Sequence, residues 1–309
     1  ENETINVFFF FSSLAQRLGV TLEQPYPSSD RSEGLANIML DALNDVKQPL
    51  TVERLMQWHR WLFNDPDWTM QRLRIGQLRG SEPMQVVSGR LDYPKVHFEA
   101  PPREGLEERL NTFIAWFNQS LNDSLLDPLL RAGITHLWFV TLHPFDDGNG
   151  RITRTLTDLA LAQMDEQSIR LYAMSTAILN KRKSYYEILE QTQKNDSDIT
   201  DWLVWFLDTL NDSLEKTLAQ ISRTLFKSQF WHKYSNLALS EEQRKVLNRL
   251  LDGGENGFEH GISASQYQKV AKISKATATR HLSDLLEKEC LVKLEGGGRN
   301  TRYQINTQL

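Results

Sequence analysis

The chain has 309 residues, of which 40% are hydrophobic and 24% charged, and its formal net charge is −5. Such a composition is typical of a globular protein with one to three domains, and the negative charge excludes a chain that is basic overall. No apolar run approaches the roughly 18 residues of a membrane span, and the lone Cys290 has no partner for an internal disulfide. These features predict a cytoplasmic protein with no membrane partner.

Residues 1–48 are expected to form an N-terminal helical segment. Five apolar residues share one helix face, namely Phe8, Phe11, Leu14, Ala15 and Leu18. Ser28-Ser29-Asp30 is a capping cluster before a second helix that extends through Leu43. The sequence starts with Glu1 rather than Met, which predicts that it begins inside a longer chain.

The next segment combines a helix with a predicted hairpin. Pro49-Leu50-Thr51 begins the helix, which continues through Leu62. Two β-prone runs at 84–87 and 95–98 flank a connection that contains Gly89, a pattern that predicts a β-hairpin over 84–98. An irregular surface loop is the alternative.

Two further helices meet at a polar loop. After a helix from Leu106 to Leu121, Asp127-Pro128 begins a second apolar helix that Pro144 ends just after His143. The loop 146–150 follows, with the sequence Asp-Asp-Gly-Asn-Gly, and another amphipathic helix begins at about Arg151.

This loop has the residue types of a nucleotide site. Glycines at 148 and 150 let the backbone approach a ligand, and the amides at a helix N-terminus favour phosphate. Arg151 and Arg154 are suited to phosphate oxygens, and a Mg²⁺ ion would explain the acidic Asp147 beside them. His143 is then placed as a general base. A plain helix–loop–helix corner is the alternative.

The stretch from His143 to Arg154 reads HPFDDGNGRITR and resembles the signature of the Fic family, H-P-F-x-[D/E]-G-N-G-R-x-x-R, at every fixed position. Members of this family mostly transfer AMP from ATP to a hydroxyl side chain of a protein. Relatives of the toxin type, which transfer phosphate, have Lys where this chain has Gly150, so Gly150 favours nucleotidyl transfer.

The resemblance implies a role for each matching residue. His143 would deprotonate the attacking hydroxyl, Asp147 would hold Mg²⁺, and Arg154 would bind the γ-phosphate. The segment that contacts ATP would comprise Asp147, Gly148, Asn149, Gly150, Arg151, Ile152, Thr153 and Arg154. The hairpin would be a flap over the active site that aligns the target by strand addition. Its residues Ser88, Gly89, Arg90 and Leu91 would border the nucleotide, and the adenine pocket would use Tyr185 or Tyr186 together with Gln193.

His136 lies seven residues before His143, on nearly the same helix face. No third His or Cys follows at zinc-ligand spacing, which favours a core histidine that braces the loop over a zinc ligand.

The last 70 or so residues predict a second domain. Three helices begin near Ser240, Ser263 and Lys275, and two short β runs flank a glycine-rich turn at 295–300. This order resembles a winged helix-turn-helix, whose third helix would enter the major groove of DNA. Five basic residues gather there, namely Lys272, Lys275, Arg280, Arg299 and Arg302. Protein contact or dimerisation is the alternative.

Free Fic cores are often inhibited by a glutamate in the motif [S/T]-x-x-x-E-[G/N], which pairs with the second arginine. Ser29 to Gly34 fits these letters with Glu33 as the acid. Glu1-Asn2 matches E-[G/N] just before a Ser-Ser-x-Ala-x-x-Leu-Gly stretch at 12–19, which favours Glu1 as the inhibitory residue.

The predicted fold is mainly α, a Fic-type helical core with a β-hairpin flap and a small C-terminal winged helix-turn-helix domain. The expected domains are the inhibitory segment 1–48, the catalytic core 49–229 and the winged domain 237–309. The expected activity is Mg²⁺-dependent transfer of AMP from ATP to a Ser, Thr or Tyr hydroxyl of a target protein or of the chain itself, with autoinhibition. Alternatives are a nucleotide-sensing transcription regulator, or an enzyme that removes AMP or transfers another phosphate-containing group. DNA and a second copy of the chain are further expected partners.

Overall fold

The structure is a computed structural model, and it describes residues 30–44, 46–64, 73–90, 93–165, 174–194, 198–253, 258, 260–294 and 301–308. The chain divides into two compact units, Glu1–Leu214 and Glu215–Leu309. The helix α9, Thr200–Lys233, contains the point of division. Near the end of this helix Phe230 is buried in the core of the second unit, together with Tyr234 just after it.

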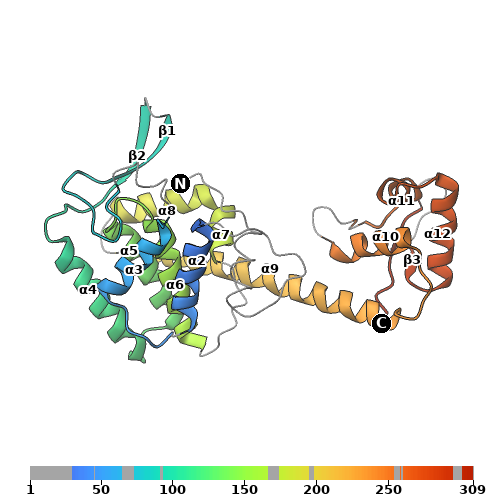
Figure 1. The fold of residues 1–309 in the computed structure, drawn as a ribbon, viewed down its shortest axis with the longest axis horizontal. Coiled ribbons are helices and arrows are strands. Elements are labelled where there is room, and N and C mark those ends of the chain that lie inside the picture. Colours follow the sequence, from blue (N-terminus) through green and yellow to red (C-terminus); the bar gives the residue numbers. More distant parts are fainter. Residues whose placement is uncertain are drawn as a thin grey trace. The chain divides into compact units, whose positions relative to one another are not determined.

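The first unit is mainly helical, as the sequence predicts (Figure 1). Its described elements, besides the start of α9, are α2 Asp30–Asn44, α3 Val52–Leu62, β1 Gln85–Arg90, β2 Tyr93–Glu99, α4 Leu106–Gln119, the 3₁₀ turn η2 Ser120–Asn122, α5 Pro128–Leu142, α6 Asn149–Asp165, α7 Met174–Asn180 and α8 Arg182–Lys194. The helix expected in residues 1–24 lies outside the described residues, and α7 was not predicted. None of the described helices is both long and apolar enough to cross a membrane.

Local capping residues set the helix starts around the predicted loop. Thr51 accepts a hydrogen bond from the Arg54 amide at the start of α3. At the start of α5, Asp127 accepts from Leu129 N–H, and Pro128 occupies the first helical turn. Buried residues lie on most sides of α5, and its long contact with α6 makes this pair the centre of the unit.

The predicted hairpin is present. β1 and β2 pair in antiparallel fashion and project from the helices (Figure 1). The pairing is irregular at one place, because Val86 is opposite Phe98 whereas Val87 is opposite Val96. His97 is therefore the extra residue of a β-bulge.

His136 is a core histidine, in agreement with the prediction. Thr157 Oγ1 donates to Thr153 O, so it accepts from His136 Nδ1–H over 2.9 Å, and Tyr185 O–H donates to His136 Nε2 over 3.0 Å. Both ring nitrogens are thus satisfied in the neutral form. Burial and, to a smaller degree, the positive charge of Arg154 together lower the pKa of His136 to about 3.

The second unit contains the end of α9, then α10 Glu241–Asp252, α11 Ala264–Ala271, α12 Lys275–Glu287, β3 Leu291–Lys293 and β4 Tyr303–Ile305. β3 and β4 pair in antiparallel fashion. Capping boxes begin α10 and α11, with Ser240 paired to Gln243 and Ser263 to Gln266. The elements follow the order that the sequence predicts for this region.

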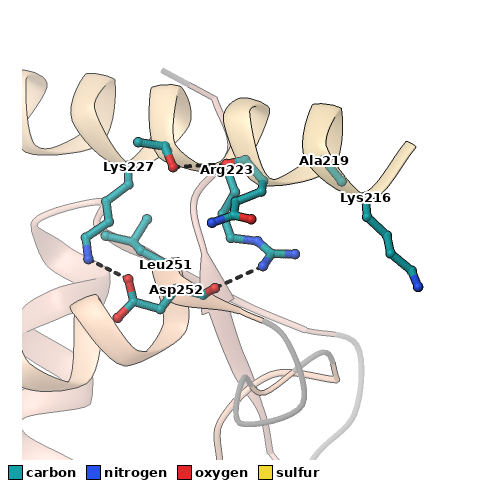
Figure 2. A pocket seen from close by; sticks show the side chains of 8 residues that line it. Lys216, Ala219, Arg223, Lys227, Leu251 and Asp252 are labelled. Carbon is teal, nitrogen blue, oxygen red and sulfur yellow. Dashed lines mark hydrogen bonds and ion pairs between the residues drawn. The ribbon is translucent and has the colours of Figure 1, made fainter. Parts of the chain in front are cut away.

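The second half of α9 packs against the end of α10 along a pocket of about 430 Å³ (Figure 2). Lys227 Nζ lies 2.5 Å from Asp252 Oδ1, and Arg223 Nη1 donates to the Asp252 carbonyl over 3.2 Å. A guanidinium at this place satisfies a carbonyl at a helix C-terminus and interacts favourably with the helix dipole.

Gly34 allows α2 and α3 to approach closely, and its replacement by alanine is expected to destabilise the first unit. A Cβ at this position would lie 1.9 Å from the backbone oxygen of Trp61. We expect Gly34→Ala to lower the free energy of unfolding by about 1–3 kcal/mol, although alanine favours helix. Urea denaturation followed by tryptophan fluorescence measures the change, and an equally or more stable variant would contradict the close packing.

The neutral, buried His136 predicts a pH-dependent stability. The unfolded chain binds a proton at this residue below about pH 6.5, whereas the folded protein does not until about pH 3. Stability is therefore lost as the pH falls from about 6.5, and His136→Gln should reduce the slope by about 1.4 kcal/mol per pH unit.

Urea titrations at about pH 6.5, 5.5 and 4.5 measure this slope before most carboxylates protonate. Tryptophan fluorescence reports mainly on the first unit, because Trp231 is the one tryptophan after Leu214. Parallel pH profiles for the wild type and the variant would show that His136 is not the source of the slope.

Candidate functional site

His143 ends α5 with a left-handed backbone. Its φ is 47° and its ψ is 59°, and the following Pro144 disfavours continuation of the helix. The ring nitrogen Nδ1 lies 3.1 Å from Val140 O. Because a carbonyl only accepts, Nδ1 carries the proton in the neutral ring and Nε2 is the basic nitrogen.

The loop after His143 is held by the side chain of Asn149. Its Oδ1 accepts from Phe145 N–H over 2.9 Å, and its Nδ2 donates to Phe145 O over 2.7 Å. Phe145 is fully buried, in agreement with its apolar character in the predicted loop. The Asn149 side chain therefore faces the loop, so the predicted phosphate contact of this residue would come from its backbone.

Position 148 requires a glycine for two reasons. Its φ is +80°, and a Cβ would lie 2.6 Å from Leu62 Cδ2. The next residue begins α6, so this turn places the N-terminal amides of the helix at the loop. The predicted anion-binding geometry depends on this close approach of the loop to α3.

The two arginines of the motif differ in their surroundings. Arg151 Nη2 lies 3.5 Å from Asp147 Oδ2, and the Arg151 guanidinium stacks over Phe63 at 5.0 Å. Within the described part of the chain, Arg154 has no carboxylate partner, and the alternative inhibitory residue Glu33 forms no ion pair with it there. Glu1 lies outside the described residues. Arg154 thus presents a positive charge that no described acid neutralises.

A pocket brings several of the predicted residues together. It is lined by His143, Gly150 and Arg154, by Tyr185, Tyr186 and Gln193 of α8, and by Val86, His97, Phe98, Val140, Leu189 and Glu190. Gln193 Nε2 donates to Thr141 Oγ1 over 2.9 Å, which fixes its carboxamide. Tyr185 is buried and its hydroxyl is bonded to His136, whereas Tyr186 is half-buried. Tyr186 is therefore the more accessible of the two tyrosines for a planar ligand.

Other predicted residues lie elsewhere. Ile152 and Thr153 are buried in the core, and Thr153 Oγ1 donates to Asn149 O. Ser88, Gly89 and Arg90 lie in β1, but the side chains of Ser88 and Arg90, like all of Leu91, are outside the described residues.

The bulge in the hairpin adds two side chains to the pocket. Consecutive residues of a regular strand face opposite sides, yet His97 and Phe98 both line the pocket. His97 Nδ1 lies 3.0 Å from Glu190 Oε2 on α8, and Glu190 Oε1 lies 2.6 Å from Lys194 Nζ. The hairpin is thus joined to α8 by a polar contact that sequence reasoning missed.

His59 of α3 is a second structural residue that the sequence did not indicate. Gly76 N–H donates to its Nδ1 over 2.9 Å, so the proton is on Nε2, which lies 3.2 Å from Asp147 O. The ring stacks on Phe145 at 4.3 Å. Burial lowers the pKa of His59 to about 4, so the ring is neutral near pH 7 while it holds the loop.

Asp147 has the chemistry to hold a magnesium ion beside phosphate. Its carboxylate is half-exposed and lies at the start of α6, and Mg²⁺ needs only one or two carboxylates when a nucleotide supplies other oxygens. Among the residues that the structure describes, no three His, Cys, Asp or Glu side chains converge as a metal-binding group. An ion at Asp147 would therefore depend on phosphate ligands.

Comparison with known proteins agrees with this geometry. Residues 49–161 match the sequence model of the Fic/DOC family. Over 119 residues the chain is 30% identical to protein adenylyltransferase fic-1 of Caenorhabditis elegans. The aligned region covers 38% of this chain and 20% of that protein. Over 96 residues it is 32% identical to protein adenylyltransferase Fic of Nematostella vectensis, and this region covers 31% of this chain and 21% of that protein. The chain therefore spans about a fifth of the length of these curated relatives.

A solved structure shows the same fold. The crystal structure of a Fic family protein from Desulfovibrio desulfuricans G20 superposes with a TM-score of 0.50 at 19% identity, covering 97% of this chain and 85% of that one. Residues 49–161, with the intact motif from His143 to Arg154, are thus similar in sequence to the Fic/DOC family, and the solved structure shares the fold of this chain.

Proposed function

We propose that this protein is a protein adenylyltransferase that transfers AMP from ATP to a Ser, Thr or Tyr hydroxyl. The observation that carries the proposal is the pocket in which His143, the start of α6 and Arg154 meet. A base, helix amides and a cation that no described acid neutralises suit a triphosphate beside an attacking hydroxyl. The relatives called protein adenylyltransferases support the same activity.

The chemical step follows from the tautomer of His143. Nε2 accepts the proton of the target hydroxyl, whose oxygen attacks the α-phosphorus of ATP. The bond from the α-phosphorus to its bridging oxygen breaks, pyrophosphate leaves with the electron pair, and AMP remains as a phosphodiester on the target. The amides of α6 and the two arginines stabilise the phosphate charge. A magnesium ion bound by Asp147 would neutralise further phosphate charge.

The nucleoside and the target would occupy opposite parts of the pocket. Tyr186 and Gln193 of α8 would contact the adenine, with Tyr185 behind them, and Ser88 to Leu91 would border the nucleotide from the hairpin. The exposed strand edge of the hairpin would align an extended segment of the target. Arg154 would bind the γ-phosphate, and a carboxylate at that place, for which Glu1 is the favoured residue, would inhibit the enzyme by excluding ATP.

His143→Ala tests the proposed base. We expect labelling from α-labelled ATP to fall by about 10²–10⁴-fold, because the attacking hydroxyl loses its proton acceptor. His232→Ala, an exposed histidine at the end of α9, is the matched control and should label like the wild type. Equal labelling by His143→Ala and the wild type would sink the assignment. Mass spectrometry of the product distinguishes added AMP from the transfer of another group, and an AMP-modified protein as substrate tests removal.

We propose a second function for the C-terminal unit, that of a winged helix-turn-helix that binds DNA. The observation that favours it is the exposed face of α12, which carries Lys275, Thr279, Arg280 and Ser283. A face of this composition suits phosphate and base contacts in a major groove. Arg302 is a poor candidate for phosphate contact, since its Nη1 donates to Gly261 O over 2.9 Å, and Arg299 lies outside the described residues.

Arg280→Ala tests this second function. Binding of a mixed-sequence duplex should weaken, and the slope of log K against log salt should fall in magnitude by about 1, because one fewer phosphate is neutralised. Lys245→Ala on α10 is the control with an exposed cation on another helix. Fluorescence anisotropy at several salt concentrations measures both quantities. Equal slopes for Arg280→Ala and the wild type would refute this face, and a wild-type chain that does not bind DNA would favour the protein-contact alternative, including a homodimer.

A further inference from the structure

Arg79 is a buried arginine to which the proposed mechanism gives no role. Its side chain is only 2% exposed, and burial lowers the pKa of the guanidinium, with the charge of Arg103 as a further cause. In the described part of the chain its partners are backbone carbonyls rather than carboxylates. Burial of a cation is costly unless hydrogen bonds compensate for its lost hydration, and the contacts of this guanidinium show what it holds in place.

Two of the contacts of Arg79 reach the proposed base and its neighbour, and a third reaches the end of the hairpin. Arg79 Nε donates to His143 O over 2.9 Å, and the Arg79 amide donates to Pro144 O over 2.9 Å. Arg79 Nη2 donates to Pro101 O. The carbonyls on both sides of the His143–Pro144 bond are thus fixed by one residue that is 64 positions away from His143.

The backbone of His143 needs this support. A non-glycine residue with positive φ stores strain and persists only where its surroundings enforce it. Rotation of the His143 peptide would move the imidazole away from Val140 O and from the pocket. The two carbonyl contacts oppose this rotation directly.

The same arginine lies where the two ends of the hairpin meet the helices. Arg79 precedes β1 and Pro101 follows β2, so the contact with Pro101 O joins the two ends. Arg103 Nε donates to Arg79 O over 2.7 Å, and Arg103 is itself paired with Glu107 at 2.5 Å. The segment also reaches the loop, because Gly80 and Arg74 amides donate to Asp146 Oδ1 and Oδ2 over 3.4 and 3.1 Å.

We infer that Arg79 is a positioning residue for AMP transfer, which holds His143 in its left-handed conformation and fixes the hairpin ends relative to it. This inference rests on the proposed function. The rigid guanidinium fork is required because Nε and Nη2 must reach two carbonyls that belong to different segments. A lysine would keep the charge but would reach only one of them.

Arg131 provides a matched control that separates a loss of stability from an effect on the site. It lies at the other end of α5, is only 3% exposed, and donates to Ser120 Oγ over 2.8 Å and to Phe117 O over 2.6 Å. Both arginines are thus buried and bound to neutral oxygens. Arg79→Lys and Arg131→Lys should therefore lower the melting temperature to a similar degree, whereas only Arg79→Lys should affect the site.

The experiment measures kcat and the KM for ATP of self-labelling, together with the ¹H–¹³C signal of the His143 ring, assigned by its loss in His143→Ala. Arg79→Lys should lower kcat by about 10²-fold, the effect of a misplaced catalytic group, with the KM for ATP within about twofold of the wild type. The His143 signal should shift in Arg79→Lys and stay in place in Arg131→Lys. Unchanged kcat and an unshifted signal in Arg79→Lys would overturn the inference.

Arg103→Ala serves if Arg79→Lys does not fold, because it removes the contact to Arg79 O and leaves the buried guanidinium in place. A several-fold fall in kcat would support the inference, and an unchanged kcat with an unshifted signal would overturn it. If the wild type transfers no AMP, the proposed function fails, while the ring signal still reports whether Arg79 positions His143.

Discussion

The paired hydrogen bonds between the Asn149 carboxamide and the backbone of Phe145 are the constraint on which the site depends. They close the loop between α5 and α6, so that the end of one helix, which carries His143, faces the beginning of the other. Phe145 anchors this turn in the core, and Gly148 lets it approach α3. The proposed base and the N-terminus of α6 are thus placed side by side by the fold itself, which is the pre-organisation that the proposed transfer of AMP would need.

Segments remote in sequence hold this turn from the outside. His59 of α3 contacts the backbone of Asp147, the 73–80 segment supplies amides to Asp146, and Arg79 holds the backbone at His143. His59 contributes a neutral ring and Arg79 a guanidinium, and both contact backbone carbonyls, whereas the carboxylate of Asp146 accepts from backbone amides. Asp147, by contrast, remains half-exposed beside Arg151, where a carboxylate can serve a metal and a phosphate. The two adjacent aspartates therefore have different tasks.

Local sequence patterns were sufficient for the loop, the capped helices and the hairpin, because turn residues, caps and periodicity act over a few positions. The residue types of the loop from His143 to Arg154 could be predicted in the same way, whereas Tyr185, Tyr186 and Gln193 were expected at the pocket only because of the resemblance to the Fic family. Arg79, His59 and the His97–Glu190 contact could not, since their partners are 64, 88 and 93 residues away and no local pattern connects them. The seven residues of α7 are too few to show a period, and the bulge at His97 breaks the alternation by which strands are recognised.

The positive charge of the pocket comes from Arg154, which no carboxylate contacts among the described residues. The chain is acidic overall, yet the described residues place no carboxylate against this guanidinium, and the nearby His136 is neutral because burial and Arg154 itself disfavour its protonation. A second cation there would add repulsion without adding a contact to a ligand, because both nitrogens of His136 are already used by Thr157 and Tyr185. Among the described residues, Arg154 thus adds a positive charge without a carboxylate partner beside the α6 terminus, whereas Arg151 lies next to Asp147. Because a phosphate and a carboxylate are both anions that a guanidinium can bind, the proposed ATP site and the proposed inhibition by an acidic side chain rest on the same feature.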